Sequence, residues 1–549
     1  MRAFRCAALL IALAATTTFG QSISDLTGLV TDPSGAVVPN ASIVAVNSET
    51  NLRRETKTDS QGRYSIAQIQ LGNYQINAAA PGFAEELVRD VHVLVNTPAT
   101  VDIRFQVGTV QQHVAVSAET TQVNTQDASL GNALGTRPII ELPFDARNVV
   151  GLLSIQPGVT YFGDPSLRDD YRSGAVNGGK SDQGNVTLDG VDVNDQQYRS
   201  AFTSVLRATL DSVQEFRTTT TNGGADVGRS SGAQVALITK SGTNALHGSL
   251  YEYTRNTLAA ANTFFNNQDG LPRQTLIRNV FGASLGGPIK KNRLFYFVNY
   301  EGRRDASQAT AVRVVPNMQF RQGIFNYQST DGSLVQLSPD QIRAIDPQHI
   351  GESPGVLKIL QSYPTPNDNT VGDGINTAGY RFNSPVPLSY NTYIARVDYQ
   401  VDTNGKHVLF WRGQMQNDHF VPSSTTTNGV PQFPGQADSI LHLENDKGIA
   451  LGYTWIITPT LVNSLRYGFT RQSYDQTGVQ TAPIVSFTAL DNPIASTTPL
   501  TAIMPVHDIE ENLTWTRGAH TILAGGSLRF ARTRRLSFAN SYSDAAMLR

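Results

Sequence analysis

Apolar and polar residues alternate along much of the chain after residue 246. In the segment 390–401 the apolar positions are Tyr393, Ala395, Val397, Tyr399 and Val401, and the polar positions are Thr392, Arg396, Asp398 and Gln400. The segments 293–303, 447–457, 460–474 and 507–517 alternate similarly. Because successive side chains of a strand point to opposite faces, each segment predicts a strand with one apolar face. Strands of about ten residues with this pattern are typical of transmembrane β-barrels, although a soluble β protein alternates in the same way.

The first part of the chain, residues 24–107, contains shorter strand-like segments without helical periodicity. These segments are 26–31, 41–46, 63–67, 73–78, 91–95 and 100–107. Turn-forming sequences separate several of them, namely Asp32–Gly35, Asp59–Gly62 and Pro81–Gly82. Short strands at this spacing predict a small β-sandwich.

Three regions depart from both strand patterns. Residues 108–126 are polar and predict a linker. Within it, the segment 112–117 is either an extended partner-binding segment or the last strand of the sandwich. Residues 127–242 mix strand-like and Gly-rich sequences with a short helix predicted after Asp145. Residues 304–388 contain many Pro, Asn, Asp and Gly residues and predict a long extracellular loop.

The N-terminus has the pattern of a secretory signal peptide, which we place at residues 1–20. Arg2 and Arg5 supply the positive charge, and residues 6–15 form an apolar segment too short to span a bilayer. Cys6 is the only cysteine, so the mature chain is expected to have neither disulfides nor thiolate metal sites. No later segment reaches the roughly eighteen apolar residues of a membrane helix, which leaves a soluble exported protein or a β-barrel.

Charge and short motifs exclude several functions. Charged residues make up 16% of the chain and the net charge is −2, without a basic stripe, so nucleic acid is not an expected partner. Residues 174–181 match a phosphate-binding loop and residues 228–232 match a nucleophile elbow. Both mechanisms require a helix after the motif, whereas both matches lead into strand-like sequence. We therefore expect no enzyme and no cofactor.

A cluster of oxygen-bearing side chains permits two interpretations. Its members are Asp189, Asp192, Asn194 and Asp195. They could form a calcium-binding loop, but their spacing departs from the alternate positions of an EF-hand loop. A turn rich in Asp and Asn is the alternative interpretation. The nine histidines make no closely spaced zinc-binding pair, so no metal site is expected.

Several segments together resemble a known family. They are 185–195, 213–217, 223–232 and 235–251, followed by 279–301 and 396–400. The first four are similar to the second half of the plug domain of TonB-dependent outer-membrane receptors, continuing into the first barrel strand. The Asp-x-x-Gly sequence before Arg63 resembles the carboxypeptidase-regulatory-like pattern. The chain is thereby identified as a member of the Oar-like branch of these receptors.

The resemblance implies a mainly β fold in three parts. These are a transthyretin-like, carbohydrate-binding-like sandwich at 24–107, an α/β plug at 127–242 and an antiparallel transmembrane barrel at 246–549. We expect roughly ten barrel strands, whereas plugged outer-membrane transporters have about twenty-two. The sequence is therefore expected to be a C-terminally truncated fragment with an incomplete barrel.

The resemblance also implies residue roles and partners. The TonB-contact residues would be Gln112, His113, Val114, Ala115 and Val116. The plug-motif residues would be Asp189, Gly190, Asp192, Asn194, Gly228, Arg229 and Gly232. The protein would lie in the outer membrane of a Gram-negative bacterium, with its N-terminal domain in the periplasm. It would import a nutrient such as an oligosaccharide, a peptide or a metal chelate with energy from a TonB-type complex. The alternative is a non-enzymatic surface protein whose N-terminal domain binds glycans or other partners.

Overall fold

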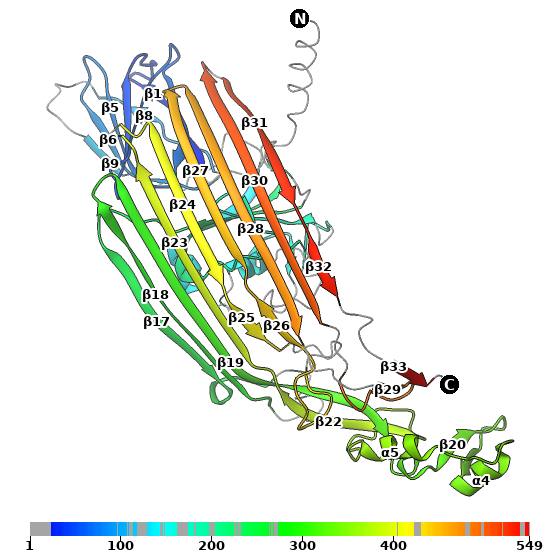
Figure 1. The fold of residues 1–549 in the computed structure, drawn as a ribbon. Helices are drawn as coiled ribbons and strands as arrows, with labels where there is room; N and C mark the ends of the chain where they lie inside the picture. Colours follow the sequence, from blue (N-terminus) through cyan, green and yellow to red (C-terminus); the bar gives the residue numbers. More distant parts are fainter. Residues whose placement is uncertain are drawn as a thin grey trace, which may run out of the picture.

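The computed structural model describes most residues between 23 and 547. Its longer gaps are 109–113, 118–128, 162–173, 197–203, 268–272, 422–429, 478–483 and 538–543. The expected signal peptide lies outside the described residues. None of the helices in the described part of the chain is long and apolar enough to cross a membrane. Figure 1 shows an N-terminal module at one end of a sheet of long strands, and a helical segment at the other end.

The N-terminal module is the predicted β-sandwich. One sheet contains β1 (Ile23–Thr31), β4 (Arg63–Gln70), β7 (Ala99–Thr100) and β8 (Ile103–Arg104). The other contains β3 (Arg53–Lys57), β2 (Ser42–Asn47), β5 (Gly72–Ala79), β6 (Glu86–Val93) and β9 (Val114–Ser117). Alternate residues of both sheets, including Leu26, Ile43 and Tyr74, are buried in one shared core. This burial explains why short alternating strands suffice for a small module.

The segment expected to be a linker contributes a strand to this module. β9 pairs in parallel with β6, so that Val114 lies opposite Glu86 and Ser117 lies opposite Arg89. Of the two interpretations of residues 112–117, the described part therefore has the geometry of an additional sandwich strand. Gln112 and His113 lie outside the described residues.

The plug is a second, mixed body with its own apolar core. Its sheet has the order β10 (Leu130–Gly135), β15 (Val213–Thr221), β16 (Gln234–Thr239), β13 (Asn185–Leu188) and β14 (Val191–Asp192). A separate pair joins β11 (Val159–Tyr161) to β12 (Gly174–Val176), and η3 (Leu210–Ser212) is a short helical turn before β15. Phe216, Leu188 and Leu237 are among the fully buried residues of its core.

The short helix predicted after Asp145 is present as a 3₁₀ helix, and the plug also contains a helix that we did not predict. Helix α2 (Thr136–Glu141) ends before the position where we expected a helix to begin, and a 3₁₀ helix, η1 (Val149–Ile155), follows. Leu142 at the end of α2 is extended and precedes Pro143. Because the residue before proline is disfavoured in the α conformation, the sequence Leu142-Pro143 ends α2.

The second half of the chain forms one large antiparallel sheet of nine long strands with shorter extensions. The long strands, in spatial order, are β17 (His247–Asn256), β18 (Leu276–Lys290), β19 (Leu294–Pro316), β23 (Leu388–Gln400), β24 (His407–Gln416), β27 (Lys447–Thr458), β28 (Leu461–Thr477), β30 (Leu500–Arg517) and β31 (His520–Ala531). The extensions are β22 (Thr377–Pro385), β25 (Asp418–Phe420), β26 (Leu441–Glu444) and β32 (Arg534–Ser537). Among the described residues the sheet is open, with β17 and β31 at its margins.

The predicted alternation separates the two faces of this sheet. On β23, Tyr393 is 46% exposed whereas Thr392 is 2% exposed. The outer face carries large apolar side chains, including Trp411, Trp455 and Trp515. The inner face is polar and covered by the plug. This arrangement reverses that of a soluble protein and is the one expected for strands in contact with lipid.

The region 304–388 contains more regular structure than we expected. β19 continues to Pro316, and β22 pairs with its extension. Between them lie a hairpin and two helices, namely β20 (Phe325–Gln328), β21 (Leu334–Leu337), α4 (Pro339–Ile345) and α5 (Pro354–Ser362). The prediction that this region is mainly loop was wrong for residues 304–316 and 377–385, which lie in strands. Small or polar residues at 306–311 weaken the alternation there, although β-branched residues at 312, 314 and 315 favour a strand.

The region beyond β19 packs into an outer cap, which we define by residues 317–376 with the segments 430–436 and 487–491. Tyr363 packs edge-on against Phe433, with 5.7 Å between ring centroids. The Tyr363 hydroxyl donates a hydrogen bond to the carbonyl oxygen of Asp491 at 2.7 Å. Val315 and Leu360 complete a small apolar core, so the cap is a packed unit at the end of the strands opposite the N-terminal module.

Candidate functional site: the plug and its contacts with the barrel wall

A tight turn places Asp189 at the tip of a plug hairpin. β13 and β14 are antiparallel neighbours joined by Asp189 and Gly190. Both turn residues have positive φ, 52° for Asp189 and 77° for Gly190. Such a two-residue turn matches the twist of the flanking strands, and Asp-Gly is a preferred sequence for it. The turn directs the Asp189 side chain toward the sheet of long strands.

The Asp189 carboxylate joins the plug to two barrel strands. Its two oxygens lie 3.1 Å from Arg396 of β23 and 3.1 Å from Arg412 of β24. Thr239 of the plug also donates its backbone N–H and its hydroxyl to the carboxylate, at 3.0 and 2.9 Å. Asp189 and Arg412 are almost fully buried. Removal of one partner from such a buried pair is strongly destabilising because the remaining charge stays uncompensated.

Other charged pairs attach the plug elsewhere on the wall. Arg207 contacts Asp418 at 2.7 Å and stacks over the ring of Tyr390. Arg147 contacts Asp211 within the plug at 2.8 Å and lies 3.9 Å from Glu301 of β19. Sequence reasoning missed these plug arginines. The available signal was the set of charged residues at inward-facing strand positions, because such residues require partners inside the barrel.

Asp192 and Asn194 form a turn rich in polar side chains, as one of the two interpretations predicted. Asp192 accepts hydrogen bonds from the backbone and side-chain nitrogens of Asn194, at 2.9 and 2.7 Å. Asn194 also donates to the side chain of Asn185 at 2.7 Å, and Arg529 of β31 contacts Asp192. Asp195 accepts from Gln472 of β28 at 2.7 Å. Over the described residues, no three His, Cys, Asp or Glu side chains cluster as a metal site would require.

The glycines of the predicted plug motif lie beside the hairpin. The N–H of Gly232 donates to the carbonyl oxygen of Gln183 at 3.0 Å. A Cβ atom at Gly232 would lie 2.6 Å from that oxygen, so the close approach requires glycine. Gly228 accepts a hydrogen bond from Gln234 at 3.3 Å. Arg229 lies outside the described residues.

The predicted TonB-contact residues lie in another body. Val114, Ala115 and Val116 belong to β9 of the N-terminal module, whereas the plug motif belongs to the sheet of β13 and β16. The two sets of predicted site residues are therefore parts of different sheets.

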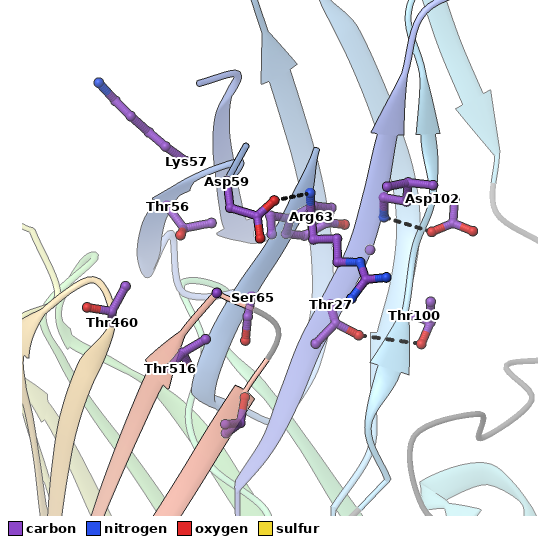
Figure 2. Close-up of a pocket in the computed structure, with 15 residues that line it drawn as sticks. Thr27, Thr56, Lys57, Asp59, Arg63, Ser65, Thr100, Asp102, Thr460 and Thr516 are labelled. Atoms are coloured by element: carbon purple, nitrogen blue, oxygen red, sulfur yellow. Dashed lines mark hydrogen bonds between the residues drawn. The ribbon is translucent and has the colours of Figure 1, made fainter. Parts of the chain in front are cut away.

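A groove of about 330 Å³ separates the N-terminal module from the nearby barrel turns. Figure 2 shows Thr56 and Ser65 of the module beside Thr460 and Thr516 of the barrel, with Thr27, Thr100 and Asp102 farther away on the module side. Asp102 accepts the backbone N–H of Leu29 at 2.8 Å, so its carboxylate is used in holding the module together. The groove is polar and contains many hydroxyl groups.

Comparison with known proteins identifies two regions of the chain. Residues 238–547 match the family described as outer membrane beta barrel domain, and residues 25–106 match the carboxypeptidase regulatory-like domain. The TonB-dependent transporter Oar of Myxococcus xanthus is 24% identical over 294 residues. This alignment covers 51% of the chain and 27% of that relative, so it spans about a quarter of the relative's length.

Solved structures of outer-membrane proteins are also similar to the chain. The outer membrane transporter YddB from Escherichia coli has a TM-score of 0.47 and 9% identity, covering 73% of this chain and 48% of its own. A mutant of the ferric enterobactin receptor from Pseudomonas aeruginosa has a TM-score of 0.43 and 12% identity, with 73% and 49% covered. Since the barrel family model matches more than half of the chain, the chain belongs to the outer membrane β-barrel family, is a homologue of TonB-dependent transporters and resides in the outer membrane of a Gram-negative bacterium.

Proposed function

We propose that the protein containing this chain imports a nutrient through the outer membrane with energy from a TonB-type complex. The observation that carries the proposal is the attachment of the plug to the inner face of the sheet through Asp189. A body held in this position must move before a large solute can pass. The homology to TonB-dependent transporters also supports import as the function.

The chemistry of the plug–wall interface suits a body that moves. Charged and amide side chains form much of the interface, including Arg207 with Asp418 and Asp195 with Gln472. When such pairs separate in a water-filled lumen, water can hydrate both partners, whereas a dry apolar interface has no equivalent compensation. The interface can therefore hold the plug at rest and release it under load.

The energy-coupling contact is proposed to lie at Gln112, His113, Val114, Ala115 and Val116, with the N-terminal domain in the periplasm. An extended segment can bind a partner by adding a strand to the edge of the partner's sheet. The pairing of β9 with β6 supports the ability of residues 114–117 to adopt this extended form.

An uptake experiment on the full-length protein tests this proposal. Cells with and without the gene would receive labelled ferric chelates, oligosaccharides and oligopeptides, each with and without a protonophore. We expect gene-dependent accumulation of one class that the protonophore abolishes. Gene-dependent accumulation that persists with the protonophore, or the absence of any gene-dependent accumulation, contradicts TonB-coupled import.

The alternative is a non-enzymatic surface protein whose N-terminal domain binds a glycan or another partner. The hydroxyl-rich groove beside the N-terminal module favours it. This function predicts that cells retain a labelled ligand at their surface and that the protonophore has no effect. Separate measurement of surface-bound and internal label distinguishes the two functions.

A further inference from the structure

An apolar contact attaches the N-terminal module to the plug. Val95, which follows β6, is fully buried against Ala236 and Ile238 of β16, and Leu71 packs beside it. The backbone N–H of Val95 donates to the carboxylate of Glu215 on β15 at 2.7 Å. Burial of both the valine side chain and its hydrogen bond makes this contact resistant to competition by water.

Hydrogen bonds attach the same module to the periplasmic end of the barrel, which we call the rim. The Asn51 side chain donates to that of Asn292, in the turn between β18 and β19, at 2.8 Å. The N–H of Asn244, just before β17, donates to the carbonyl oxygen of Glu49 at 3.0 Å. On the other side of the module, Gln68 donates to Thr514 of β30 at 2.6 Å.

The rim contacts are discrete rather than continuous. The groove shown in Figure 2 separates the module from the turns at Thr460 and Thr516. The Asn51–Asn292 hydrogen bond is exposed, so water competes for both groups. Under load, the exposed Asn51–Asn292 contact should therefore break before the buried Val95 contact does, whereas the Gln68–Thr514 hydrogen bond is itself buried.

We propose that the N-terminal module is a clasp that holds the plug to the rim of the barrel. The plug and the module move as one unit, and the plug leaves its position only when the module has separated from the rim. That the plug and the module move as one unit, the first statement, does not depend on import. That the plug leaves its position only after the module has separated from the rim, the second statement, rests on the proposed function because it concerns plug movement during uptake.

A covalent lock at the rim tests the clasp. The full-length protein would carry Cys6→Ser, Asn51→Cys and Asn292→Cys, and a short bismaleimide would join the two new cysteines. Protease cleavage between residues 213 and 239 in increasing urea would report release of the plug from the barrel. We expect the cross-link to raise the urea midpoint for cleavage by about 0.5–1 M.

Matched controls distinguish the effect of the cross-link from the effect of the cysteine substitutions. The same double variant without cross-linker, and each single-cysteine variant with it, should release the plug at the urea midpoint of the unlocked protein. An unchanged midpoint in the cross-linked protein overturns the clasp, whatever uptake shows.

Uptake by the locked protein then tests the second statement. We expect loss of uptake that is restored when the cells carry only one of the two cysteines. Normal uptake by the locked protein overturns the requirement for separation and leaves TonB-dependent import intact. Absence of uptake in the unmodified protein refutes the proposed function, while the urea measurement still decides whether the module acts as a clasp.

Discussion

The plug has two interfaces that differ in chemistry, although the one toward the N-terminal module also includes the charged side chains of Glu215 and Arg217. Toward the barrel wall it presents charge, with Asp189 between Arg396 and Arg412 and with Arg207 against Asp418. Toward the N-terminal module it presents Ala236 and Ile238, which enclose Val95. The two interfaces should therefore respond differently to water. Hydration of the charged groups can separate the plug from the barrel wall, whereas the apolar contact of Val95 with the plug is stable only while water is excluded from it.

The substitution Asp189→Ala should weaken the charged interface between the plug and the barrel wall most strongly. The substitution leaves two arginines without their shared carboxylate, and we expect a loss of about 3–5 kcal/mol in the free energy of unfolding. Urea unfolding of the full-length protein in detergent measures it. Asp368→Ala in the outer cap is the matched control, since its partner Arg381 is 36% exposed and the expected loss is about 0–1 kcal/mol. Equal losses for the two variants would contradict the role of the Asp189 contact.

The stability of the folded protein around the Val95 contact should depend on pH through Glu215. Burial raises the pKa of this carboxyl from about 4.5 to about 7, while the N–H of Val95 and nearby Arg217 oppose the rise. The folded protein therefore retains the proton more strongly than the unfolded chain. The contribution of Glu215 to the free energy of unfolding should be largest below about pH 4.5 and decrease up to about pH 7, by on the order of 3 kcal/mol.

The protection factor of the Val95 amide against hydrogen exchange measures this dependence. Glu215→Gln keeps a hydrogen-bond acceptor without a titratable group, so its protection should be nearly constant over the same range. A pH profile that is identical in both proteins would rule out Glu215 as the titrating group.

The substitution Val95→Ala tests the apolar contact between the N-terminal module and the plug. Loss of two buried methyl groups should weaken docking by about 1–2 kcal/mol and lower the protection of residues 91–95. Val37→Ala is the control because Val37 lies in the same module and is 45% exposed. Similar effects of both substitutions would indicate a general loss of module stability rather than a weaker contact.

The smallest effect is expected from Gly190→Ala at the hairpin tip. A positive φ of 77° strains alanine by about 1 kcal/mol, which should appear as a small decrease in the urea midpoint. Asparagine tolerates this conformation better, so Gly190→Asn should have less effect. The reverse order of the two variants would argue against the positive-φ turn.

Prediction from sequence succeeded where a pattern is local. The alternation in β23 and the turn rich in Asp and Asn at residues 189–195 depend on neighbouring residues, so the strand faces and the turn were predicted. The partners of Asp189 could not, because Arg396 and Arg412 lie 207 and 223 positions away and sequence spacing does not determine which inward charges meet. The Val95 contact gave no signal either, since Val95 ends the strand-like segment 91–95 and is most simply interpreted as part of the sandwich core.

The length of β19 has a consequence for the proposed import of a solute. At about 3.3 Å per residue, its 23 residues extend for about 75 Å, whereas the apolar band of a barrel is only about 25 Å tall. Even in a tilted strand, a stretch on the order of 40 Å lies outside the apolar band, and the outer cap is attached at its far end. In the proposed import function, a solute would first meet the outer cap at a distance from the plug. Its binding to the cap and its passage through the lumen would then differ in rate and in selectivity.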